Sequence, residues 1–175
     1  LLPFIRKNLP TLRFIIAPHE IHANEIDKLI QNLAGKAVRY SVAEASTIAD
    51  YRVLIIDNIG LLASLYRYGT YAYIGGAFGK GLHNTLEAAV FGLPLFFGPA
   101  YTKFQEAIDL VTLQCAFPVQ NTSELMEKFE QLNADPGKKT LIKEKAESYL
   151  AQHAGATTKI LAACQQWLKN TAWKD

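Results

Sequence analysis

The sequence has few cysteines, almost no excess of positive over negative charge, and no long apolar segment. Each of these absences argues against a class of protein. The two cysteines, Cys115 and Cys164, lie far apart with no Cys-x-x-Cys pair, which argues against a disulfide framework and favours a reducing compartment, the cytoplasm. Eighteen Lys and Arg residues stand against 16 Asp and Glu residues, a balance that indicates neither disorder nor a surface for nucleic acid. We therefore expect a folded protein without a nucleic-acid partner.

Apolar runs are also too short to cross a membrane. The longest, residues 88–100, is interrupted by Gly92 and Pro94 and falls short of the roughly 20 residues that span a bilayer. The first residues contain Arg6, Lys7 and Pro10, which break the apolar core that a secretory signal needs. We expect a soluble single domain, because 175 residues suffice for one core, and we expect it to be a fragment of a longer chain.

Short apolar runs alternate with helical patterns along most of the chain. The run at 12–18 ends in proline, and in the segment 23–35 that follows it Ile26, Ile30 and Leu33 share one helix face before Gly35 stops the helix. The same alternation predicts strands at 37–42, 52–57, 71–76, 94–99 and 115–119, and helices at 59–69, 83–92, 104–114 and 122–133. Continuous apolar strands followed by helices are typical of an open parallel α/β sheet with helices on both faces.

The end of the chain is predicted to be helical. Thr122 or Ser123 is expected to cap the helix 122–133, because hydroxyl side chains accept hydrogen bonds from the first turn. The segment 135–139, Asp-Pro-Gly-Lys-Lys, is typical of a turn, and a mostly helical tail should follow as far as Trp173.

A glycine-rich segment, Gly75 to Gly81, follows one of the predicted strands. At the carboxyl end of a parallel strand, Gly75 and Gly76 allow successive backbone N–H groups to converge on an anion, and Lys80 adds a positive charge. Neither a P-loop nor a Gly-x-Gly-x-x-Gly motif fits the spacing. The segment is either a phosphate-binding loop or a structural turn.

Asn84 and Glu87 stand three residues apart at the start of the next helix. This spacing is that of a capping box, in which each side chain satisfies the other residue's backbone. The alternative is that Glu87 accepts the two hydroxyls of a ribose whose phosphate binds the glycine loop.

His19, Glu20 and His22 follow the first predicted strand. The spacing lacks the second histidine of His-Glu-x-x-His, so we expect no metal site, and His19 is either a ligand of an anion or sugar or an ordinary loop histidine. Asp57, with Asn58, Ser64 and Tyr66 near it, is a weaker candidate because such residues more often cap helices.

Three segments in this order resemble the donor-binding half of GT-B glycosyltransferases, and among them the 3-deoxy-D-manno-octulosonic acid (Kdo) transferases. The segments are "APHEI", "VLIIDNIGLLASLY" and "GGAFGKGLHNTLEAAVFGLPLFFGPAYTKFQEA", and the resemblance extends from Leu1 to about Tyr149. It implies a Rossmann-like domain over residues 1–175. It also implies that the chain begins inside the first helix and lacks both the preceding strand and the N-terminal acceptor domain.

The resemblance implies a site and a reaction. Backbone N–H groups of Gly76, Ala77 and Phe78 would face the phosphate of CMP-Kdo, Asn84 and Glu87 would hold the nucleotide, and His19 would lie near the donor, whereas Lys80 rests on its charge and position alone. No cofactor is implied. Kdo would pass to a lipid A precursor at the cytoplasmic face of the inner membrane, where the whole protein would associate peripherally. The general base would lie in the missing domain, so this chain would hold no catalytic residue and be inactive alone.

Two other functions remain open from the residues. One is a UDP-sugar-using GT-B glycosyltransferase or an epimerase domain, which would use the same glutamate on the ribose. The other is a non-catalytic α/β module that binds a ligand or partner through the same crevice.

Overall fold

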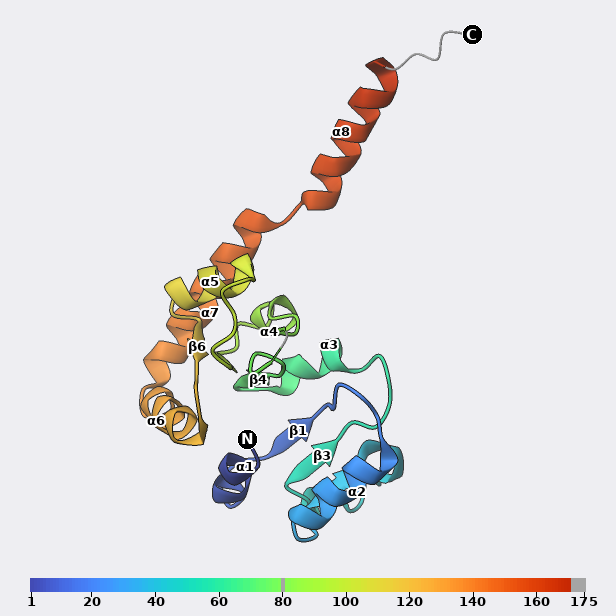
Figure 1. The fold of residues 1–175 in the computed structure, drawn as a ribbon, viewed down its shortest axis with the longest axis vertical. Coiled ribbons are helices and arrows are strands. Elements are labelled where there is room, and N and C mark those ends of the chain that lie inside the picture. The colour runs from blue at the N-terminus through green and yellow to red at the C-terminus, as the bar shows by residue number, and fades with distance from the viewer. Residues whose placement is uncertain (80, 171–175) are drawn as a thin grey trace.

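Six short parallel strands form the centre of the molecule, in two separate sheets of three. The computed structural model describes residues 1–79 and 81–170 (Figure 1). The strands are β1 (Phe14–Ile16), β2 (Ala37–Arg39), β3 (Val53–Ile55), β4 (Ala72–Ile74), β5 (Leu95–Phe97) and β6 (Ala116–Pro118). One sheet has the order β1-β3-β2 and the other β4-β5-β6. The predicted parallel α/β class is confirmed, with the strands divided between two sheets.

Helices connect these strands and follow the last one. The α-helices are α1 (Leu2–Asn8), α2 (Ala23–Asn32), α3 (Leu62–Leu65), α4 (Leu86–Ala89), α5 (Gln105–Thr112), α6 (Thr122–Asn133), α7 (Pro136–His153) and α8 (Ala156–Asn170). Short 3₁₀ turns are η1 (Tyr40–Val42), η2 (Ile48–Asp50) and η3 (Tyr66–Tyr68). The strand predicted over 37–42 therefore ends at Arg39, and the helix predicted over 83–92 is limited to one turn, α4.

The first sheet buries the same face against both α1 and α2. Residues two apart on a strand share a face, and the register aligns Ala37 and Phe14 with Val53, so these side chains lie on one side of the sheet. The core on that side combines them with Ile5 of α1 and with Ile26 and Leu33 of α2. Arg6 also donates two hydrogen bonds to Asn32, which fixes α1 beside α2.

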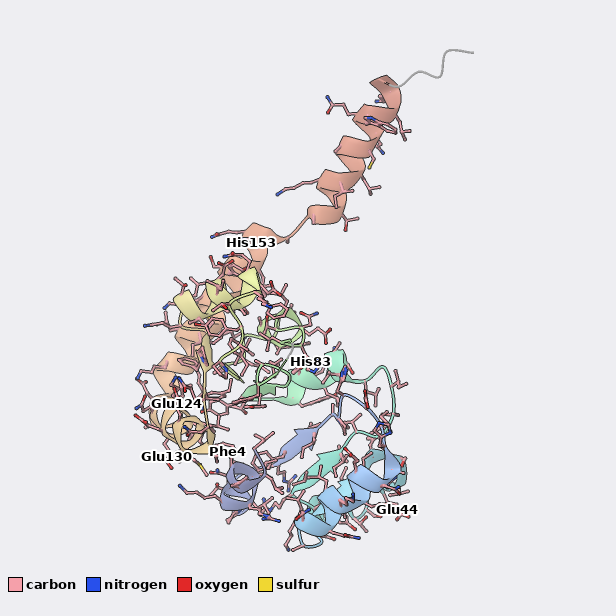
Figure 2. All side chains as sticks on the ribbon, in the orientation of Figure 1. Phe4, Glu44, His83, Glu124, Glu130 and His153 are labelled. Atoms are coloured by element: carbon pink, nitrogen blue, oxygen red, sulfur yellow. The ribbon has the colours of Figure 1, made fainter. Side chains whose placement is uncertain are left out.

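The second sheet is covered on both faces. All three residues of β5 are buried, which requires apolar neighbours above and below because successive strand side chains point in opposite directions. Ala88 and Ala89 of α4 and Leu110 of α5 belong to this core. Phe4 of α1 also belongs to it, and its ring packs edge-on against Phe129 of α6, so α1 contacts the cores of both sheets (Figure 2).

The end of the chain differs from the prediction in its helix caps. The cap of α6 is Asn121, whose side chain accepts a hydrogen bond from the Glu124 backbone 3.0 Å away, rather than Thr122 or Ser123. Residues 135–139 are the start of α7 rather than a turn, because Asp135 caps the helix and Pro136 occupies its first position. The tail is helical as predicted, up to Asn170, and Trp173 lies outside the described residues.

α8 extends away from both sheets (Figure 1) and leaves apolar side chains such as Ile160 and Leu168 exposed. None of the helices in residues 1–79 and 81–170 has the length and apolar character required to cross a bilayer.

Candidate functional site

The loop after β4 begins with a glycine that no other residue can replace without a clash. Gly76 has a φ of +98°, and a Cβ there would lie 2.4 Å from the carbonyl oxygen of Gly81. The Gly79 N–H donates back to the Gly76 carbonyl over 3.1 Å, closing a tight turn. The sequence therefore keeps glycine at 76 because the backbone turns in the left-handed region and folds closely on itself.

The backbone N–H groups at the start of this loop form no hydrogen bond within the described part of the chain. Neither backbone nor side-chain hydrogen bonds are found for the N–H groups of Gly76, Ala77 and Phe78, although the Ala77 carbonyl accepts from Ala100 over 2.9 Å. Gly98 at the end of β5 allows this approach, since a Cβ there would lie 2.6 Å from the Ala77 oxygen. Gly76 and Phe78 are exposed whereas Ala77 is fully buried, so an anion at this carboxyl end of a parallel strand could reach the N–H groups of Gly76 and Phe78.

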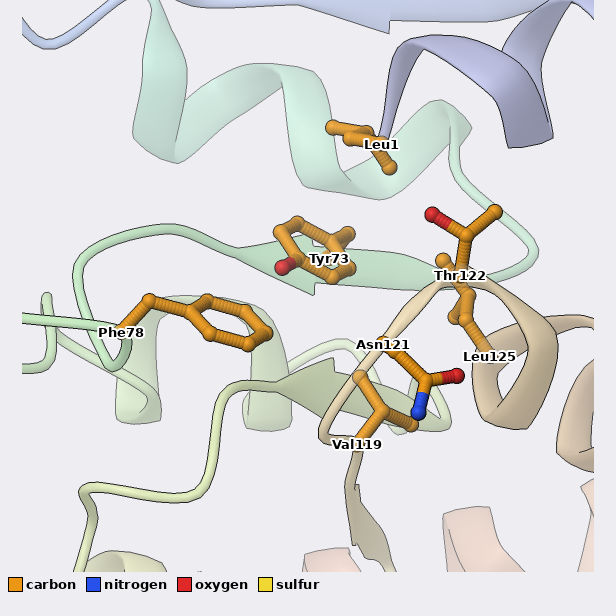
Figure 3. Close-up of a pocket in the computed structure, with 7 residues that line it drawn as sticks. All are labelled: Leu1, Tyr73, Phe78, Val119, Asn121, Thr122 and Leu125. Carbon is orange, nitrogen blue, oxygen red and sulfur yellow. The ribbon is translucent and has the colours of Figure 1, made fainter.

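Phe78 projects from this loop over a cavity at the same edge of the second sheet. The cavity has a volume of about 290 Å³ and the Phe78 side chain is 57% exposed. Figure 3 shows Phe78 and Tyr73 on one side of it and the start of α6 on the other. Its lining residues are Leu1, Tyr73, Phe78, Val119, Asn121, Thr122 and Leu125.

Two histidines bring the loops after β1 and β4 together. The rings of His19 and His83 lie with centroids 4.4 Å apart and planes tilted by 34°. The His83 N–H donates to the carbonyl of Gly75 over 3.3 Å, and the His83 ring lies where a Cβ of Gly75 would touch it. His19, predicted as a site residue, therefore lies at the glycine loop, and His83 joins it.

Asn84 and Glu87 contact each other directly. The Asn84 amide donates to a carboxylate oxygen of Glu87 over 3.0 Å, and the Asn84 side-chain oxygen accepts from the Leu86 N–H. The capping box is not formed as predicted, because the Asn84 side chain bonds the backbone of Leu86 rather than that of Glu87, and Glu87 bonds the Asn84 side chain rather than its backbone. The partly exposed Glu87 carboxylate also acts on Tyr66, whose pKa is raised first by burial and then by this nearby negative charge.

The weaker candidates after β3 have structural partners. Asp57 accepts hydrogen bonds from the backbone N–H and the hydroxyl of Ser41, and these outweigh the opposing effect of burial, so the pKa of Asp57 lies below its usual value. The Ser64 hydroxyl donates to the Leu61 carbonyl within its own helix. These contacts tie loops and a helix turn together.

Two further predictions concern charge at the site. Lys80, predicted to contact the phosphate, lies outside the described residues. Glu20 pairs with His22 over 2.8 Å, and no cluster of three or more potential metal ligands occurs in residues 1–79 and 81–170.

Comparison with known proteins bears on what this site binds. No protein-family model matches the chain. It is 31% identical over 118 residues to the 3-deoxy-D-manno-octulosonic acid transferase of Bordetella pertussis, covering 66% of this chain and 28% of that protein. It is 30% identical over 131 residues to the enzyme of the same name from Aquifex aeolicus, covering 73% of this chain and 35% of that protein.

The chain is related to the Kdo transferases. The resemblance predicted from the three sequence segments is confirmed, and the chain spans 28% to 35% of the length of these two curated relatives. Among solved structures, the C-terminal CMP-Kdo binding domain of WaaA from Acinetobacter baumannii matches with a TM-score of 0.72 and 24% identity, over 85% of this chain and 78% of that one. This second match establishes the fold.

Sequence reasoning did not single out His83, which the structure places at the candidate site beside the glycine loop. His83 stands next to Asn84 in the segment that carries the resemblance, so its position in the sequence could have indicated that it lies near the site. The contact of His83 with His19 could not be predicted, because residue spacing in one sequence does not indicate that loops from two different sheets meet.

Proposed function

We propose that this chain is the donor-binding part of a Kdo transferase and binds CMP-Kdo at the carboxyl end of β4. The observation that carries the proposal is the exposed glycine loop, where the N–H groups of Gly76 and Phe78 have no acceptor among the described residues and the His83 ring packs close by, in contact with His19. These groups suit a phosphate, and kinship with proteins named Kdo transferases supports a CMP-linked sugar as the ligand that carries it.

Glu87 is proposed to bind the ribose of the nucleotide. Its carboxylate receives one hydrogen bond from the Asn84 amide, and a carboxylate has room for several donors, so acceptor positions remain for sugar hydroxyls. The Gly75 carbonyl holds His83 at the loop by accepting a hydrogen bond from its backbone N–H, and Lys80 is proposed to add its charge to the phosphate site.

Transfer needs groups that we assign to the rest of a longer protein. We place the general base and the acceptor site for a lipid A precursor in an N-terminal domain, and the whole protein at the cytoplasmic face of the inner membrane as a peripheral protein. Correct positioning of the reactants can lower the barrier to transfer by roughly 7–11 kcal/mol. A general base accelerates the reaction by a further factor of about 10²–10⁴. The isolated chain should therefore bind donor and transfer nothing.

Calorimetric titration of the chain with CMP, UMP and inorganic phosphate tests this proposal. We expect CMP to bind more tightly than UMP and phosphate more weakly than either, because a cytosine pocket accepts a hydrogen bond from the amino group that uracil lacks. Preference for UMP would favour a UDP-sugar enzyme. Equal affinity for all three ligands would favour a non-catalytic ligand-binding module and would refute the assignment.

A further inference from the structure

The loop after β5, residues 98–104, leaves the second sheet beside the glycine loop. The parallel register pairs Ile74 with Phe97, and each of these is the last residue of its strand. Both loops therefore start at the same level of one edge, the carboxyl edge at which parallel sheets bind their ligands. This is also the edge proposed to bind the phosphate of the donor.

Two contacts keep these loops together beyond their starting points. The Ala100 N–H donates a hydrogen bond to the Ala77 carbonyl over 2.9 Å. Further along, a Cβ on Gly81 would lie 3.9 Å from the Phe104 ring, so the end of one loop lies next to the end of the other. A side chain on the loop after β5 can therefore share a ligand with the backbone of the glycine loop.

Lys103 lies at the tip of a turn whose two ends are fixed. The Phe104 N–H donates to the Tyr101 carbonyl over 3.0 Å, and the Tyr101 ring packs on Phe97 with ring centroids 5.5 Å apart. The Lys103 side chain is exposed and forms no ion pair with any described residue. In the described part of the loops that follow β4, β5 and β6, it is the only lysine or arginine. An unpaired positive charge therefore stands on the loop next to the proposed phosphate position.

The proposed donor carries two negative groups on one carbon atom. Its sugar is an ulosonic acid, whose carboxylate is bonded to the anomeric carbon, and in the activated sugar this carbon also bears the phosphate. The carboxylate and the phosphate are therefore only a few ångströms apart. A phosphate bound to the exposed N–H groups of Gly76 and Phe78 leaves the carboxylate without a partner in the glycine loop, and a lysine on the adjacent loop supplies the complementary charge.

We propose that the Lys103 ammonium group binds the carboxylate of the donor sugar, so that the site selects a sugar acid over a neutral sugar on the same nucleotide. This inference rests on the proposed function and adds to it the group that recognises the sugar. The glycine loop and Glu87 bind the nucleotide whatever sugar it carries. Lys103 increases affinity only for a donor whose sugar brings a negative charge to the loop after β5.

Calorimetric titration of three ligands against the unmodified chain and Lys103→Met tests this inference. The first ligand is CMP, and the second is CMP-Kdo with a fluorine next to the anomeric carbon, which slows the spontaneous loss of CMP. The third is the methyl ester of the second, in which the carboxyl group is neutral. We expect Lys103→Met to lower the affinity for the acid about three- to tenfold, the range of an exposed charged hydrogen bond, and to leave the affinities for the ester and CMP unchanged. Lys103→Arg should retain the preference for the acid.

Lys36→Met is the matched control for the loss of one positive charge. Lys36 is exposed and precedes β2, so it lies at the opposite, amino edge of the first sheet, and its replacement should change none of the three affinities. An equal loss for all three ligands in Lys103→Met would overturn the proposal, because Lys103 would then act on the phosphate or on the shape of the loop. Unchanged affinity for the acid would overturn it as well. If the unmodified chain fails to bind CMP, the proposed function fails together with this inference, whereas CMP binding without an effect of Lys103→Met on the acid refutes this inference alone.

Discussion

The imidazole rings of His19 and His83 pack against each other with centroids 4.4 Å apart, although they follow strands that belong to different sheets. The contact brings the loop after β1 to the glycine loop after β4, against which the His83 ring lies. It also makes His83, which precedes the Asn84–Glu87 pair, the residue that links the two parts of the proposed donor site.

Replacing His83 should weaken nucleotide binding. We expect His83→Ala to lower CMP affinity about two- to tenfold, the value of one lost hydrogen bond of ~0.5–1.5 kcal/mol, as measured by calorimetry. His22→Ala is the matched control, because His22 pairs with Glu20 and makes no hydrogen bond or ring contact with the described residues of the glycine loop. If both variants bind CMP like the unmodified chain, His83 is not a ligand.

Adding one methyl group at Gly76 should destabilise the loop after β4. Gly76→Ala combines a left-handed backbone with a Cβ 2.4 Å from the Gly81 oxygen, so the free energy of unfolding should fall by more than the ~1–2 kcal/mol of backbone strain alone. Urea unfolding measures the loss.

Two other glycines serve as controls for this change. Gly60 has a φ of +94° with open space around it, so Gly60→Ala reports backbone strain alone, and Gly79→Ala should cost least because a Cβ there meets only one atom, 4.0 Å away. If Gly60→Ala and Gly76→Ala lower the free energy of unfolding equally, the close approach of residue 76 to the Gly81 carbonyl does not contribute to stability.

Neutralising Glu87 should separate its two roles. Glu87→Gln keeps the shape of the side chain and an acceptor oxygen for the Asn84 amide, but it is a poorer acceptor for ribose hydroxyls. We expect CMP affinity to fall by about 1–3 kcal/mol while thermal stability changes little. Lower stability with unchanged affinity would identify Glu87 as a structural residue only.

The pairing of Asp109 with Tyr149 should make stability depend on pH in acid. Hydrogen bonds from Gln105 and then from the Tyr149 hydroxyl lower the pKa of Asp109. A lowered pKa in the folded state stabilises the fold above the unfolded value, about 3.9, and this contribution is lost as pH falls through the folded pKa. The stability difference between the unmodified chain and Asp109→Asn should therefore shrink below about pH 4 in urea titrations.

The same pair should act with the opposite sign in alkali. Burial, followed by the hydrogen bond to Asp109, raises the pKa of Tyr149 to about 12. A raised pKa stabilises the fold below the unfolded value of about 10, and the effect is lost as pH rises from there towards the folded pKa. Tyr149→Phe should remove this loss above pH 10. An unchanged alkaline profile in that variant would contradict the assignment.

Much of the fold could be predicted from local sequence patterns. Apolar runs predicted all six strands, and α6 begins and ends at the predicted residues because its amphipathic pattern is long and uninterrupted. The cap of α6 was missed because Asn121, Thr122 and Ser123 are all good caps, and tertiary position selects among them. The start of α7 was missed because Asp-Pro-Gly is typical of turns, although Asp followed by Pro is equally a helix start.

The site was predictable only in part. The glycine loop, Asn84 and Glu87 lie in one segment, so their proximity follows from the chain. The separation of the strands into two sheets and the meeting of His19 with His83 depend on contacts between distant segments, which local patterns do not encode.

The most direct test of donor binding is to titrate the ¹⁵N-labelled chain with CMP and follow each backbone amide by NMR. We predict shifts centred on Gly76, Ala77, Phe78 and His83, because these residues form or contact the loop that is proposed to bind the phosphate. UMP should cause smaller shifts at equal concentration. Shifts confined to a separate cavity that is lined by Leu113, Lys145, Ser148, Tyr149 and Gln152, or no shift at millimolar CMP, would contradict the proposal that this chain binds the donor at the glycine loop.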